Sequence, residues 1–91
     1  MAHTTRDKEK LLVRVRRIRG QVEALEKALD QDDDCSKILH LIAGSRGAMD
    51  GLMAEVLEGH IRSHLADPKA KPSERAQATE DVIELIRSYL R

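Results

Sequence analysis

The hydrophobic positions of the chain recur at helical spacing from residue 11 to residue 29. The intervals alternate between four and three residues, which is the heptad pattern of a helix with one apolar seam. The seam consists of Leu11, Val15, Ile18, Val22, Leu25 and Leu29. Thr4 or Thr5 can cap the start of this helix, and a polar run at residues 31–34 follows its last apolar position. We therefore predict a helix over about residues 5–29.

A longer helix is predicted over residues 34–66, where Asp33 or Asp34 can cap the start and no proline occurs before Pro68. It carries two apolar sets. The first is Ile38, Ile42, Ser45, Met49, Leu52 and Val56, and the second is Leu39, Leu41, Met53, Leu57, Ile61 and Leu65. At a rise of ~1.5 Å per residue, about thirty residues span about 45 Å. Because its apolar surface is long and wide, this helix is expected to pack against neighbours on two sides.

A third helix is predicted over residues 73–90, opened by Pro72 or Ser73. Its apolar face consists of Val82, Ile83, Leu85, Ile86, Tyr89 and Leu90. We expect an all-α, three-helix subunit with antiparallel neighbours, forming a single domain over residues 1–91. Three helices do not enclose the long one, so two chains are expected to share a core. The composition agrees, because 91 residues with no Phe or Trp and 35% charged residues make a marginal monomer.

The composition also excludes several classes of protein. The single cysteine, Cys35, cannot form an intrachain disulfide. No stretch approaches the ~18 apolar residues of a membrane span or the layout of a signal peptide. We therefore expect a cytoplasmic protein with no membrane contact. The sequence offers no Ser/His/Asp set and no glycine-rich phosphate loop, which argues against an enzyme.

Lys and Arg together number 16, as do Asp and Glu, but these charges are unevenly distributed. From Arg6 to Arg19, seven basic residues stand against two acidic ones, a local net charge of +5 that the rest of the chain balances with −5. This segregation predicts a basic surface on the first helix that binds a polyanion such as promoter DNA. The alternative is an ordinary solvated helix face. The expected DNA contacts are Lys8, Lys10, Arg14, Arg16, Arg17 and Arg19.

His60 and His64 are four residues apart, which places two imidazoles on one helix face at a spacing that suits one metal ion, although such pairs also occur by chance. Cys35 projects from the same side of the helix at 100° per residue. It lies 25 residues before His60, however, about 37 Å along an unbroken helix. Either the motif is accidental or the site lies between chains. Two antiparallel copies of this helix would bring Cys35 of one beside both histidines of the other.

Small residues near the centre of the long helix favour that arrangement, because they let two backbones approach. They are Gly44, Gly47, Ala48 and Gly51. A thiolate with two imidazoles suits a borderline transition metal. His3 can add an imidazole, and removal of Met1 would expose the amine of Ala2, so a site with more than four ligands is available.

The segments RVRRIRGQVEAL (residues 14–25) and RGAMDGLMAEVLEGHI (residues 46–61), together with Cys35, carry a family resemblance. They resemble the small all-helical bacterial repressors that include copper, nickel–cobalt and formaldehyde sensors (the CsoR, RcnR and FrmR types). The resemblance covers residues 5–90. It implies a three-helix subunit, a disc-shaped homotetramer made of two antiparallel dimers, and a repressor that binds promoter DNA only when its effector is absent.

The ligand positions within this resemblance match the nickel–cobalt subgroup. They are His3, Cys35, His60 and His64. The match implies a repressor of metal efflux or resistance genes that Ni(II) or Co(II) releases from DNA, with Zn(II) as a further candidate and no organic cofactor. Copper sensors have Cys at the position of His64 and commonly Tyr at that of Asp34, so copper is not expected.

Formaldehyde sensors are the alternative. They resemble this chain closely in the first helix, but they use a proline amine beside the initiator Met and usually carry Glu at the position of His64. This chain departs from both features, with Ala2 and His64. Because Ala2 can still present an amine and Cys35 keeps the thiol, a formaldehyde-responsive repressor of a detoxification operon remains the second interpretation.

Overall fold

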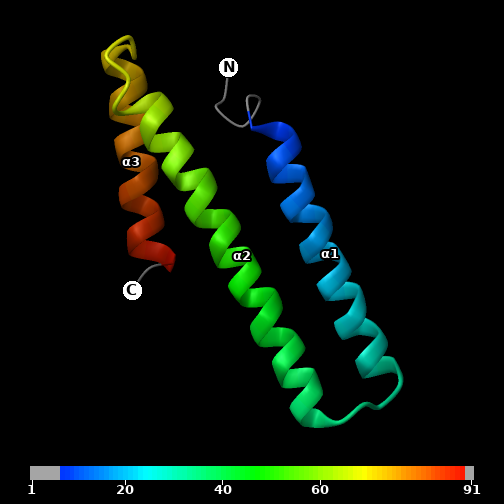
Figure 1. The fold of residues 1–91 in the computed structure, drawn as a ribbon. Helices are drawn as coiled ribbons and strands as arrows, with labels where there is room; N and C mark the ends of the chain where they lie inside the picture. Colours follow the sequence, from blue (N-terminus) through cyan, green and yellow to red (C-terminus); the bar gives the residue numbers. More distant parts are fainter. Residues whose placement is uncertain (1–6, 90–91) are drawn as a thin grey trace. The chain divides into compact units, whose positions relative to one another are not determined.

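The computed structural model describes residues 7–89, which form three α-helices (Figure 1). These are α1 (Lys8–Asp30), α2 (Cys35–His64) and α3 (Pro72–Tyr89). The all-α prediction is confirmed, because the described residues contain no strand. The predicted ranges 5–29, 34–66 and 73–90 identify the same three helices with slightly different ends. The proposed caps Thr4 and Thr5 lie outside the described residues, and Asp7 occupies the N-cap position without a side-chain cap.

The connection between α1 and α2 explains where both helices end and begin. Asp32 has a φ of 52°, and its N–H donates to the Leu29 carbonyl at 3.2 Å, while the Asp33 N–H donates to the Ala28 carbonyl at 2.9 Å. This pair of bonds is a Schellman motif, which satisfies the last carbonyls of α1 through one left-handed residue. Asp34 then accepts the Ile38 N–H at 3.1 Å and starts α2.

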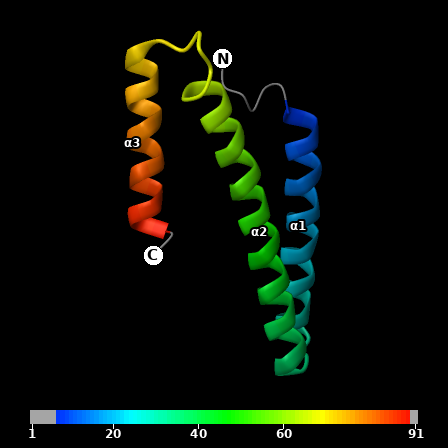
Figure 2. The same cartoon turned by 60° about the vertical axis from the view of Figure 1, so that its left-hand side comes forward.

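The described residues divide into two compact units. The first, from Asp7 to Ala54, is a helical hairpin of α1 and most of α2, which lie side by side in Figures 1 and 2. The second, from Glu55 onward, contains the end of α2 together with α3. Few hydrophobic side chains are buried within either unit of the single chain. Among the described residues they are Ile18, Ala28 and Ala78.

Only part of the predicted seam of α1 is covered by the chain itself. Ile18 is buried, and Leu11 and Leu25 are half-buried. The other three seam positions are exposed: Val15, Val22 and Leu29. A hairpin of two helices therefore covers one edge of the seam and leaves the other edge open.

The apolar surface of α2 is also incompletely covered. No residue along the whole of α2 is buried. Four apolar side chains of α2 are exposed: Leu39 by 60%, Ile42 by 45%, Met49 by 54% and Met53 by 38%. At 100° per residue, all four point within about 40° of one direction from the helix axis. We refer to these four residues as the open face of α2. Within the hairpin, α1 packs against α2 and leaves this open face uncovered.

The glycines of α2 differ in their surroundings. A Cβ at Gly51 would lie 3.0 Å from Nη1 of Arg14, so the guanidinium of α1 approaches the α2 backbone there. Apart from the adjacent residues and the nearby backbone of α2 itself, no atom of the described residues lies within 4 Å of the corresponding position at Gly44 or Gly47. Gly51 therefore serves packing within the hairpin, whereas Gly44 and Gly47 are open. No helix in the described part of the chain has the length and apolar character needed to cross a membrane.

Candidate functional site

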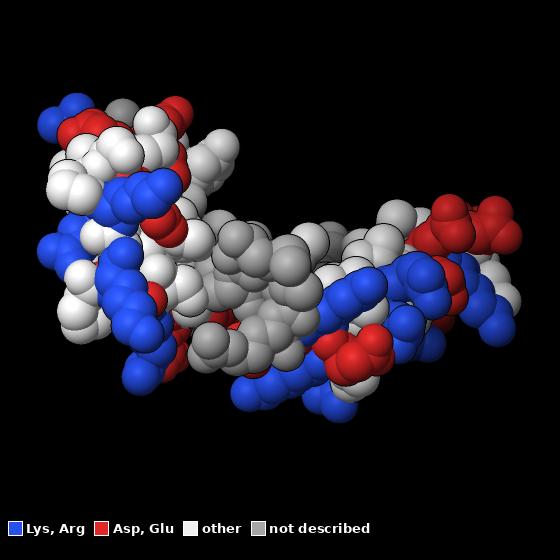
Figure 3. Space-filling view, turned by 90° about the horizontal axis from the view of Figure 1, so that it is seen from above, with Lys and Arg blue, Asp and Glu red and all other residues white. Residues whose placement is uncertain are grey.

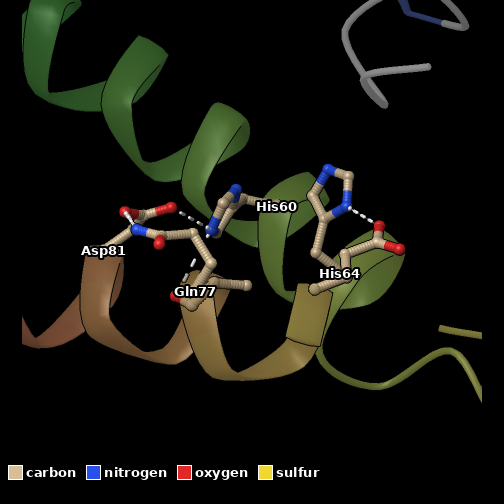
Figure 4. Close-up of a pocket in the computed structure, with 6 residues that line it drawn as sticks. His60, His64, Gln77 and Asp81 are labelled. Atoms are coloured by element: carbon tan, nitrogen blue, oxygen red, sulfur yellow. Dashed lines mark hydrogen bonds and ion pairs between the residues drawn. The ribbon is translucent and has the colours of Figure 1, made fainter. Parts of the chain in front are cut away.

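The two histidines predicted as a ligand pair lie together in the unit formed by the end of α2 and α3. The ring centroids of His60 and His64 are 5.1 Å apart, as expected for residues one helical turn apart. Figure 4 shows both rings beside the first turns of α3. An open pocket of about 300 Å³ surrounds them, and it is lined by His60, His64, Glu74, Gln77, Ala78 and Asp81.

His64 is paired with a carboxylate from α3. Its Nδ1 lies 2.6 Å from Oε1 of Glu74 (Figure 4). In a neutral imidazole one nitrogen donates and the other carries a lone pair. With Nδ1–H donating to Glu74, the lone pair of His64 is on Nε2.

His60 contacts α3 through its Nε2 atom, whereas His64 does so through Nδ1. Its Nε2 lies 3.4 Å from the Ala78 carbonyl oxygen and 3.8 Å from Oδ2 of Asp81. Asp81 is itself a hydrogen-bond acceptor of Gln77 Nε2 at 3.0 Å. With Nε2–H donating toward these oxygens, the lone pair of His60 is on Nδ1. Histidine ligands of metals are commonly held in this way by carbonyl or carboxylate acceptors.

The remaining predicted ligands are not brought to this pair within one chain. Cys35 is the first residue of α2, 25 residues before His60 in the same helix, and its thiol is exposed. His3 and the Ala2 amine lie outside the described residues. Among residues 7–89 of a single chain, no group of three or more His, Cys, Asp or Glu side chains is placed to hold a metal ion. One chain therefore offers two oriented imidazoles, with the thiol at the other end of α2.

The sequence interpretation missed the residues of α3 that orient the histidines, Glu74 and Asp81. Glu74 has one local signal: it is the third residue of a helix that begins at Pro72, where a glutamate can bond to the N-cap amide. That signal indicates a helix start and says nothing about His64. Only the packing of α3 against the end of α2 brings the two side chains together.

The basic residues of α1 lie on more than one side of the helix. At 100° per residue, Lys10 and Arg17 share one side, and Lys8, Arg16 and Arg19 share another. All five are exposed, whereas Arg14 is half-buried with its guanidinium near Gly51. In Figure 3, Lys and Arg side chains alternate with Asp and Glu on the face in view. The predicted basic surface is thus two rows rather than one uniform patch.

Three comparisons place the chain among known proteins. A family model described as metal-sensitive transcriptional repressor matches residues 7–88. An uncharacterised protein in the bioA 5′ region of Serratia marcescens is 55% identical over 91 residues, and the transcriptional repressor RcnR of Citrobacter koseri is 41% identical over 91 residues; both alignments cover 100% of each chain.

A solved structure is also similar, that of a glutamate-to-histidine variant of the formaldehyde-responsive regulator FrmR from Salmonella enterica serovar Typhimurium. It is 48% identical, with a TM-score of 0.83, and the match covers 92% of this chain and 94% of that chain. The three-helix fold expected from the family resemblance is confirmed by this likeness.

The contact between His64 and Glu74 predicts a pH effect. The hydrogen bond from His64 is the main cause that lowers the pKa of the Glu74 carboxyl, with smaller contributions from the His64 charge and the Lys71 backbone amide. A lowered carboxyl pKa favours the folded state above the unfolded pKa, and this contribution disappears as the pH falls through the folded value. We expect His64→Ala to raise the Glu74 pKa, measured by NMR titration of the side-chain carboxyl.

The exposed His40, near the start of α2, provides the control, because His40→Ala leaves the Glu74 contact intact. An unchanged Glu74 titration in His64→Ala would contradict the assignment of His64 as the principal donor to this carboxylate.

Proposed function

This chain belongs to the metal-sensitive transcriptional repressor family, and from that premise we propose that it binds operator DNA when effector-free and releases it on binding Ni(II) or Co(II). The family consists of transcriptional repressors, which are not enzymes. The observation that carries the effector assignment is the His60–His64 pair, with ring centroids 5.1 Å apart and each ring beside an acceptor of α3. Two oriented imidazoles and a thiolate form a donor set for a borderline metal.

The thiolate comes from a second copy of the chain in this proposal. Cys35 and His60 lie on one continuous helix and are 25 residues apart, so they do not meet within a chain. The open face of α2 supports an antiparallel pairing of two α2 helices. Pairing of two such dimers into a homotetramer would cover further apolar side chains, including Val22 of α1.

His3 and the Ala2 amine are proposed as additional ligands of the same ion. A site with more than four ligands suits Ni(II) and Co(II), and Zn(II) remains a candidate for a smaller ligand set. Effector binding weakens DNA binding only if the two states of the protein differ in metal affinity, and this coupling is reciprocal. Binding of the ion by His3 and the Ala2 amine would change the position of α1, which carries the basic rows.

Formaldehyde is the second candidate effector. The relative of known structure is derived from a formaldehyde-responsive regulator and is 48% identical, and the exposed Cys35 thiol can react with an aldehyde together with the Ala2 amine. His64 is the residue that separates the two candidates. Its imidazole contributes to a metal site, whereas aldehyde cross-linking requires only an amine and a thiol.

The effector is tested by release of operator DNA, followed by fluorescence anisotropy during titration with Ni(II), Co(II), Zn(II), Cu(I) and formaldehyde. We expect the wild type to respond to Ni(II) and Co(II). His64→Glu should weaken this response about tenfold or more, because it replaces an imidazole ligand. His40→Glu, an equivalent exchange at an exposed histidine, should respond as the wild type does. Release by formaldehyde at low excess, without release by Ni(II) or Co(II), would replace the metal proposal with the aldehyde one.

The DNA interface is tested at Arg17, which is exposed and lies on the same side of α1 as Lys10. Arg17→Ala should weaken operator binding and flatten the log–log salt slope by about 0.9 for each phosphate contact removed. Arg62→Ala is the matched control, because Arg62 is 76% exposed and pairs with Glu58 at 2.8 Å on the end of α2. An unchanged salt slope in Arg17→Ala would exclude this row of α1 from the interface.

Arg14→Ala is a less selective test of the same interface. The Arg14 guanidinium lies beside Gly51 of α2, so its removal also changes packing within the hairpin. Its effect on DNA binding should therefore be compared with its effect on thermal unfolding.

Sharing of the effector site is tested by mixing two inactive variants. Cys35→Ala and His60→Ala should each lose Co(II)–thiolate absorption. A heterodimer of the two variants contains one site with both wild-type residues, so mixing should recover part of the absorption. Verified heterodimers that recover none would contradict a site formed between chains.

A further inference from the structure

We propose that Glu74 is a positioning residue for the effector: its carboxylate holds the His64 ring so that Nε2 is presented to the metal ion. The inference rests on the proposed function, because it assigns a role within the same site. It goes further by naming a residue of α3 and the ring nitrogen through which His64 binds.

The first support is the geometry of the contact. Glu74 Oε1 lies 2.6 Å from His64 Nδ1, a short separation typical of a hydrogen bond to a charged acceptor. The His64 side chain is only 19% exposed, whereas that of Glu74 is 43% exposed. Rotation of the ring to bind through Nδ1 would break the contact with Glu74.

The second support is the way in which Glu74 itself is held. It lies in the first turn of α3, where the Lys71 backbone amide contributes to lowering the pKa of its carboxyl. The Lys71 carbonyl accepts the Arg75 N–H at 2.9 Å, which places Lys71 at the N-cap of α3. Glu74 is therefore the third residue after the N-cap, which is the position of the glutamate in a capping box. The start of the helix thus sets the backbone position from which the Glu74 side chain reaches His64.

The connection that leads into α3 is tied down as well. Arg75 Nη2 donates to the Asp67 carbonyl at 2.8 Å, and the Lys69 N–H donates to Asp67 Oδ1 at 2.9 Å. The loop between α2 and α3 is therefore bonded at Asp67 to the first turn of α3, in which Glu74 lies. A fixed acceptor lowers the cost of orienting a ligand, which is the role that outer-sphere carboxylates play at metal sites.

The two histidines differ in this respect. His60 is oriented chiefly by the main-chain carbonyl of Ala78, at 3.4 Å, which no side-chain substitution removes. His64 bonds to a side chain, that of Glu74, so this contact can be removed by one substitution. Substitution of Glu74 should therefore affect His64 selectively.

Three variants separate the contributions of Glu74. Glu74→Ala removes the acceptor and the cap, Glu74→Gln keeps a capping side chain and a neutral acceptor oxygen, and Glu80→Ala is an exposed control on α3. Co(II) and Ni(II) affinities are measured by absorption titration. We expect Glu74→Ala to bind about 10–100-fold more weakly. Glu74→Gln should be intermediate, and Glu80→Ala should match the wild type.

The tautomer of His64 provides a readout that a purely structural role would not change. Long-range ¹H–¹⁵N correlation spectra of the metal-free protein should show the proton of the neutral His64 ring on Nδ1 in the wild type. Glu74→Ala should move this proton toward Nε2, and Glu74→Gln should retain it in part. A wild-type ring protonated on Nε2 would overturn the inference.

A double-substitution test distinguishes positioning from other roles. In a His64→Ala background, Glu74→Ala should cause no further loss of affinity, because its target is absent. A loss of the same size in that background would mean that Glu74 acts as a ligand or through the fold, and the inference would be wrong. If the Glu74→Ala chain does not fold, as judged by circular dichroism, Glu74→Gln carries the same comparison.

The outcome also separates this inference from the proposed function. If the wild type binds Co(II) or Ni(II) and Glu74→Ala binds equally well, the inference fails and the repressor proposal stands. If the wild type binds neither ion, both fail.

Discussion

The length of α2 limits how much of this helix a single chain can cover. This helix has 30 residues, and none of them is buried within the single chain. In the hairpin, α1 covers one side of α2, and the open face of α2 remains exposed. Burial of apolar surface is the main driving force for both folding and association. A chain that leaves Leu39 and Met49 more than half exposed has a strong physical reason to pair with another copy.

The same helix length determines where an effector site can form. A thiol at the first residue of α2 and two imidazoles near its last residue are too far apart to bind one ion within the chain. Assembly and sensing therefore become linked in our proposal, since the contacts that cover the open face also supply the missing ligand. A repressor built in this way would couple effector affinity to the arrangement of its subunits.

The histidine pair shows how α3 contributes to such a site without supplying a ligand. The hydrogen bonds of His60 and His64 to α3 involve opposite ring nitrogens, Nε2 and Nδ1 respectively. Each imidazole therefore presents a different nitrogen, and the two rings are tilted by 57° with respect to each other. This asymmetry follows from their acceptors: a main-chain carbonyl lies within α3, and a carboxylate lies in its first turn.

Local patterns in the sequence were sufficient for the helices themselves. Heptad spacing in α1, the uninterrupted apolar sets of α2 and the proline at the start of α3 each act within a few residues, so the three helices and the i, i+4 histidine pair could be predicted. The sequence also indicated that Cys35 and His60 cannot meet in one chain, because helix rise depends only on residue number.

The contacts of His64 and Arg14 with other helices depend on tertiary packing alone. Glu74 is ten residues from His64, and a loop separates the two residues. No periodic pattern in the sequence indicates that Glu74 lies beside the Nδ1 atom of His64. Likewise, Arg14 is half-buried because its guanidinium lies beside Gly51, whereas the other described arginines of the same basic segment are exposed. Helix formation depends on neighbours along the chain, whereas a hydrogen bond between helices depends on how their faces meet in three dimensions.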